Sequence, residues 1–135
     1  YARVPLGHWL QQWFGFERNH YDRIGHLMQG FVPAIVAREL LLRLTPLSRP
    51  DMRGGWLFTL VTAVCLAISA LYELIEWGAA VALGAGADEF LGTQGDPFDT
   101  QTDMFCAWLG AMAAQWLLAR RHDRQLRALP GADPG

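Results

Sequence analysis

The chain has 135 residues, of which 52% are hydrophobic and only 18% are charged, against about 25% charged in an ordinary soluble domain. This composition argues against intrinsic disorder, and a net charge of −2 without any lysine argues against a nucleic-acid partner. All 11 basic residues are arginine, and none lies between residues 54 and 119, where seven of the 13 acidic residues are found. Such segregation of charge indicates a small polytopic membrane protein.

The N-terminal part contains an aromatic segment followed by a weakly apolar span. Residues 4–16 mix apolar, aromatic and polar side chains, and we expect them to lie in the membrane interface with their tryptophans as anchors. The first span is predicted at residues 24–44. Because charges that face lipid are costly, we expect Arg38, Glu39 and Arg43 to be paired or near the interface.

The most apolar part of the chain predicts the second span, at residues 54–83, whose first nineteen residues carry no charge. A third span is predicted at residues 97–119. Asp96 and Pro97 indicate its start, with aspartate as the N-cap and proline at the first helical position.

The predicted fold is all-α: a transmembrane helical bundle of three spans in one membrane domain, residues 1–127, followed by a flexible tail, residues 128–135. Arginines favour the cytoplasmic side of a membrane. The loop between the first two spans and the C-terminus are arginine-rich, so both are predicted to be cytoplasmic. The loop of residues 84–103 contains acids and no basic residue, and is predicted outside a bacterial inner membrane.

This orientation brings three sequence-distant polar groups to one depth near the outer face. Each group comes from the outer end of a different span, and helical spacing places its members on one helix face. We therefore predict a polar site formed by Asp22, His26, Glu73, Glu76, Asp96, Asp99 and Asp103.

Several carboxylates in one place need compensation by protons, by arginine or by a cation. Imidazole together with carboxylate suits Zn, Mn or Fe(II), so a divalent metal is one prediction for this site. The nearby Arg23 is the candidate contact for a phosphate or lipid head group. The candidate metal ligands are His20, Asp22, His26, Glu76, Asp99 and Asp103.

Plainer structural roles remain open for the same residues. Asp96 and Asp99 could simply cap a helix, and Glu73 could hydrogen-bond a neighbouring helix. We expect His8 and His122 to be exposed and without function.

The segment of residues 90–104 contains Gly92, Gly95 and Pro97, which predict a tight, shaped turn. Its neutral polar side chains could bind a polar head group at the membrane surface. The alternative is a re-entrant turn whose polar groups satisfy one another.

Four runs of sequence resemble the YjdF-like family of bacterial inner-membrane proteins. They are HYDRIGH (20–26), ARELLLR (37–43), YELIEW (72–77) and FLGTQGDPFDTQTDM (90–104). That family has Trp where Phe98 stands, and its members are longer, with helices upstream. The resemblance implies the membrane class and leaves the chemistry unassigned. Since this chain begins at Tyr1, we expect upstream segments to be missing.

A more distant similarity is to VanZ-like proteins, which are linked to glycopeptide-antibiotic resistance. No catalytic role follows from it. The pattern that carries it consists of Asp22, His26, Glu76, Asp99, Asp103 and Gly110.

Three functions are compatible with these features, all with membrane lipids as surroundings. The first is an enzyme or metal-binding protein that acts on an envelope or lipid-linked substrate. The second is an accessory subunit that packs against other membrane protein subunits through Gly110, Ala113 and Ala114. The third is a proton or cation pathway, for which Glu39 would be the cytoplasmic-side acid.

Overall fold

The computed structural model describes residues 5–15, 19–49, 53, 55–84 and 96–128. In this part of the chain the structure is helical and contains no strand, so the predicted all-α fold is confirmed. The elements in chain order are α1 (Pro5–Phe14), α2 (Tyr21–Leu44), the short 3-10 helix η1 (Pro46–Ser48), α4 (Trp56–Leu83) and α6 (Asp99–Arg127).

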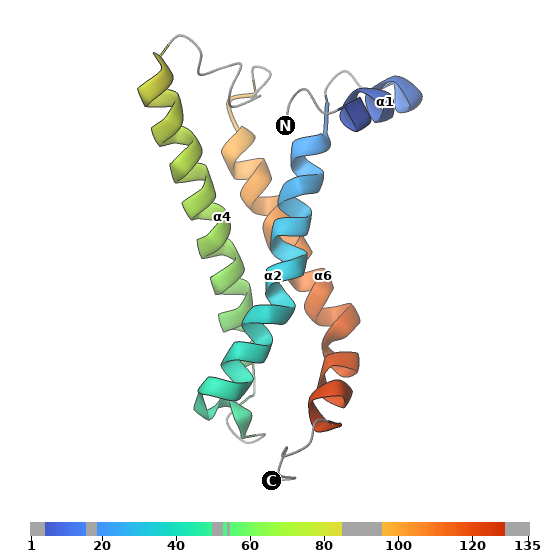
Figure 1. The fold of residues 1–135 in the computed structure, drawn as a ribbon, viewed down its shortest axis with the longest axis vertical. Helices are drawn as coiled ribbons and strands as arrows, with labels where there is room; N and C mark the ends of the chain where they lie inside the picture. Colours follow the sequence, from blue (N-terminus) through green and yellow to red (C-terminus); the bar gives the residue numbers. More distant parts are fainter. Residues whose placement is uncertain (1–4, 16–18, 50–52, 54, 85–95, 129–135) are drawn as a thin grey trace.

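The three long helices correspond to the three predicted spans. Among the described helices, α4 alone is long and apolar enough to cross a membrane, over Trp56–Ala82. The helices α2 and α6 carry more polar and charged residues, and the count of three spans stays a prediction. In Figure 1, α2 and α6 run in the same direction, and α4 runs in the opposite direction beside them.

The helix α6 begins two residues after the start of the predicted third span and continues beyond its predicted end, so the limits of the span itself stay a prediction. The helix α6 begins at Asp99, because the Asp96 side chain accepts a hydrogen bond from the Phe98 backbone N–H (2.9 Å) and holds a turn before the helix. Asp96 is therefore not the N-cap. At the other end α6 continues to Arg127, with arginines in its last turn, where positive charge stabilises a helix end.

The centre of the bundle is a close crossing of α2 over α6, which Figure 1 shows as an X. A Cβ atom on Gly30 would overlap the carbonyl oxygen of Ala107, and one on Gly110 would overlap the carbonyl oxygen of Leu27. Two glycines thus let the backbones touch. Small buried side chains continue this contact: Ala34, Ala37, Ala111 and Ala114. The spacing of Gly110 and Ala114 favours close helix contact, for which a partner subunit was one alternative. In the structure Gly110 contacts α2, and Ala114 is buried within the chain.

The helix α4 packs against this pair through Val61 and Cys65, which are fully buried. A buried hydrogen bond joins α4 to α6, in which Gln115 donates from Nε2 to Thr62 Oγ1 at 3.0 Å. Val61, Cys65 and Ala111 belong to one apolar cluster, which lies below the predicted outer site.

The end of the bundle farther from that site is held by ion pairs. Buried Arg38 donates to His122 Nδ1 and to Asp123 Oδ1, both at 2.8 Å, and Arg43 pairs with Glu39 at 2.8 Å. The expected pairing of the α2 charges is confirmed. The expectation that His122 is exposed was wrong, because Arg38 holds its ring against α2. His8 is exposed, as expected.

The crossing predicts opposite effects for the same substitution at matched helical glycines. Replacing glycine by alanine inside a helix normally stabilises by about 0.5–1 kcal/mol, and we expect Gly78→Ala to behave in this way because nothing lies within 4 Å of its added Cβ. Gly30→Ala and Gly110→Ala should instead destabilise by about 1–3 kcal/mol, because the backbones must separate. Thermal unfolding in detergent measures the difference. Equal melting temperatures for the three variants would contradict the crossing.

Candidate functional site

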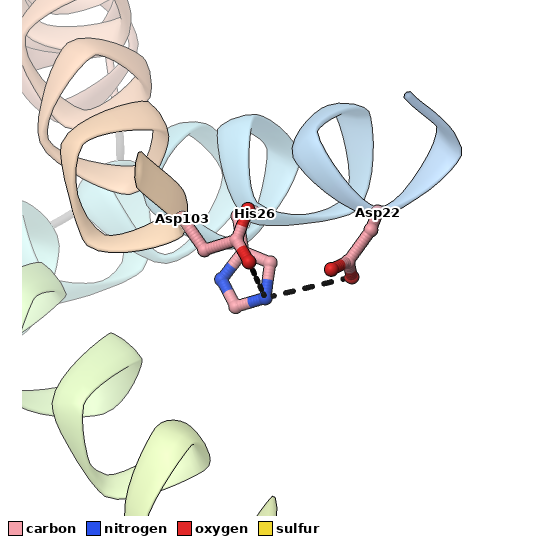
Figure 2. A group of neighbouring side chains, drawn as sticks. All are labelled: Asp22, His26 and Asp103. Atoms are coloured by element: carbon pink, nitrogen blue, oxygen red, sulfur yellow. Dashed lines mark ion pairs between the residues drawn. The ribbon is translucent and has the colours of Figure 1, made fainter. Parts of the chain in front are cut away.

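The site is centred on His26, whose side chain is only 3% exposed and faces carboxylates from three helices. Its Nε2 atom lies 3.4 Å from Glu73 Oε1 of α4, 3.7 Å from Asp22 Oδ1 of α2 and 4.0 Å from Asp103 Oδ2 of α6. Figure 2 shows Asp22 and Asp103 reaching the same edge of the imidazole ring. The predicted meeting of three distant segments is therefore present in the structure.

The helix crossing explains how Asp103 reaches His26. Gly30 lies one turn after His26 on α2, and Ala107 lies one turn after Asp103 on α6. Since Gly30 touches the Ala107 backbone, the two polar side chains one turn above are brought into contact. Asp22 reaches the same place because it precedes His26 by four residues on α2.

The cluster has hydrogen-bonding capacity that the described protein groups do not fill. His26 Nδ1, Asp103 Oδ1 and Glu73 Oε1 are buried and have no hydrogen-bond partner. Donor atoms of Asp22, His26 and Asp103 all lie within 4.8 Å of one another. Carboxylates this close cannot all remain charged unless a proton or a cation lies between them.

The spacing of these donors suits a metal ion. Ligand atoms that surround a tetrahedral zinc at 2.0–2.2 Å are about 3.3–3.6 Å apart. The distances of Glu73 and Asp22 from His26 Nε2, 3.4 and 3.7 Å, are close to that range, while Asp103 lies farther away at 4.0 Å. Glu73 is thus the carboxylate nearest to His26, although it is not among the metal ligands predicted from the sequence. Glu73 does not belong to the donor set formed by Asp22, His26 and Asp103.

The remaining predicted residues lie around this centre with other contacts. Glu76 accepts a hydrogen bond from Tyr72, its neighbour four residues before it on α4. Asp99 is buried in the first turn of α6. Neither they nor His20 belong to the three-residue donor set of the described chain.

Arg23 is engaged by the protein itself. Its guanidinium donates to Asp96 Oδ2 at 3.0 Å and lies 3.3 Å from His20 Nδ1. Asp96 thereby joins the start of α2 to the turn before α6. A phosphate or head group would have to compete with this carboxylate for Arg23, and that contact stays a prediction.

An open pocket of about 250 Å³ adjoins the cluster on the side between α2 and α4. Most of its lining was not predicted from the sequence. The pattern on α2 was nevertheless present there, because Tyr21, Gly25 and Gln29 recur at intervals of four residues beside Asp22 and His26. The lining residues are Tyr21, Asp22, Gly25, His26, Gln29 and Tyr72. The proposed head-group turn falls largely on residues 85–95, outside the described part.

Comparison with known proteins supports the membrane class. The family described as "Predicted membrane protein (DUF2238)" matches residues 1–124. The chain is 58% identical over 128 residues to the inner membrane protein YjdF of Escherichia coli (strain K12), which confirms the YjdF-like resemblance. This match covers 94% of the chain and 59% of that relative. No solved structure matches, and the VanZ-like similarity stays a prediction.

The crowded carboxylates predict that neutralising one of them stabilises the metal-free protein. In a chelator, Asp103→Asn keeps the side-chain shape and removes one like charge, so we expect a gain of about 1 kcal/mol, or roughly 3 °C in melting temperature. Asp96→Asn is the matched control, since Asp96 already pairs with Arg23 and should give no gain. A fall in melting temperature for Asp103→Asn would show that its charge is already compensated.

Proposed function

The chain belongs to the DUF2238 family of predicted membrane proteins, and from that premise we propose that it binds a divalent cation between Asp22, His26 and Asp103. Glu73 would complete the site from α4. The observation that carries the proposal is the convergence of three donor atoms within 4.8 Å, in a cluster where Asp103 Oδ1 and Glu73 Oε1 are buried without a hydrogen-bond partner. One imidazole nitrogen with carboxylate oxygens favours Zn²⁺, Mn²⁺ or Fe²⁺.

The proposed role of the cation is to act on an envelope or lipid-linked substrate. A bound cation would polarise a phosphoryl or carbonyl oxygen of that substrate. The adjacent open pocket supports this role, because it is bordered by His26 and Asp22. The chain spans about 59% of the length of its relative, so residues outside this chain could add to the site in longer relatives.

An accessory-subunit role has weaker support than the metal site. The small residues that suggested a docking face, Gly110 and Ala114, are buried against α2. A cation or proton pathway likewise meets the apolar layer of Val61, Cys65 and Ala111 between the two polar ends.

The metal site predicts a defined stoichiometry. Protein purified in detergent and loaded with Zn²⁺ or Mn²⁺ should hold about one ion per chain by mass spectrometry, and His26→Ala and Asp103→Asn should hold less than a tenth of that. At a free ion concentration of 100 times Kd, binding should stabilise the wild type by about 2.7 kcal/mol.

Asp123→Asn is the matched control for metal content. It alters an ion-paired carboxylate on α6 at the opposite end of the bundle, so it should keep the full ion content. The metal proposal would be refuted if the wild type took up no ion and the site variants remained monodisperse. Loss of the monodisperse peak in the site variants alone would instead favour a structural role for the acids.

The orientation proposed from the arginine distribution places the cluster toward the outer face. In a Cys65→Ala/Cys106→Ala background, Phe98→Cys should react with a membrane-impermeant maleimide on intact spheroplasts, because Phe98 is exposed at the start of α6. Arg49→Cys, at the opposite end, should react only after permeabilisation. The reverse pattern would place the site at the cytoplasmic face.

A further inference from the structure

The pocket beside the cluster is bordered only by α2 and α4 among the described elements, and α6 does not line it. A pocket lined by two neighbouring helices of a membrane protein can border lipid. One lining residue, Gly25, is exposed and has open space around its Cα. A molecule could therefore enter from the bilayer without passing through the bundle.

Apolar side chains continue the pocket along both helices. On α2, Met28 and Val32 follow Gly25 at three and seven residues, which places them on the same helix face, and both are exposed. On α4, Ile68 lies four residues before Tyr72 on the same face and is also exposed. These exposed apolar side chains lie on each helix between the pocket and the middle of that helix.

The surface of the pocket is mostly apolar, with a small polar part, and its lining includes no basic side chain. His26 Nδ1 and Gln29 Oε1 are buried there without hydrogen-bond partners. A hydroxyl group would donate to Gln29, whereas a phosphate would find no arginine in the lining. The volume of about 250 Å³ equals roughly eight water molecules, enough for a glycerol-sized group but not for an acyl chain.

We infer that this pocket binds the uncharged, hydroxyl-bearing head group of a membrane amphiphile, which enters sideways from the bilayer between α2 and α4. Its hydrocarbon chain lies along Val32 and Ile68, outside the pocket. This inference rests on the proposed function, because it names the substrate class that the cation at His26 would face.

The test uses a diacylglycerol with a photoreactive group on one acyl chain, in phosphatidylcholine nanodiscs containing the protein loaded with metal. The wild type should be labelled on α2 and α4. Gly25→Leu fills the pocket and should lower labelling at least fivefold. Gly78→Leu, the matched control on an exposed, open position of α4, should leave it unchanged.

A second variant, Gln29→Met, removes the acceptor without closing the pocket and should lower labelling by about threefold to tenfold, as expected for one lost hydrogen bond. Unlabelled diacylglycerol should compete at least tenfold better than phosphatidic acid. Equal labelling of wild type and Gly25→Leu would overturn the inference, and equal competition by phosphatidic acid would overturn the uncharged head group.

Metal analysis of the same samples separates this inference from the proposed function. The Gly25→Leu variant should keep its ion but lose the lipid label. That result would separate the binding of lipid from the binding of metal. If the wild type is labelled but holds no ion, the amphiphile site stands and the metal proposal fails. If the wild type holds its ion but is not labelled, the amphiphile inference fails alone.

Discussion

The structure depends on the direct backbone contact between α2 and α6 at Gly30 and Gly110. Between helices in a bilayer the hydrophobic effect gives little driving force, so close van der Waals packing of small residues has to supply it. The same contact fixes the functional geometry, because His26 and Asp103 lie one turn from it on their respective helices. A shift of the crossing by one turn would separate these two side chains by about 5 Å.

The two polar ends of the bundle differ in how they are compensated. Buried Arg38 donates to His122 Nδ1 and to Asp123 at 2.8 Å, so its charge is matched, although His122 Nε2 makes no hydrogen bond and lies 3.6 Å from Glu39. At the other end, the carboxylates of Asp22, Glu73 and Asp103 surround His26, and in the described part of the chain their ion pairs are all with His26. Burial of charge without compensation is expensive. This difference in charge balance supports the proposal that a proton or a cation compensates the outer cluster.

The sequence predicted the helices and the convergence of His26, Asp22 and Asp103, because helical periodicity and charge segregation are local signals. It did not predict the burial of His122, which depends on Arg38 more than eighty residues away. The internal use of Gly110 was missed for a related reason, since a small-residue spacing does not say which helix it contacts. The role of Gln29 could not be predicted from the sequence, because it depends on the pocket between α2 and α4.

The depth of the cluster bears on the kind of substrate it can meet. Glu73 lies nine residues before Ala82, the end of the apolar stretch of α4, and so about 14 Å from that end along the helix axis. The starts of α2 and α6 are closer, because His26 follows Tyr21 by five residues and Asp103 follows Asp99 by four, which places both within about 8 Å of those helix ends along the axis. The proposed amphiphile would have its head group near the interface and its chain in the bilayer, so a pocket between α2 and α4 would require only a lateral movement. Under that proposal, the donors one or two turns from the helix ends and the pocket beside them would serve one purpose, the presentation of the chemistry to a lipid head group.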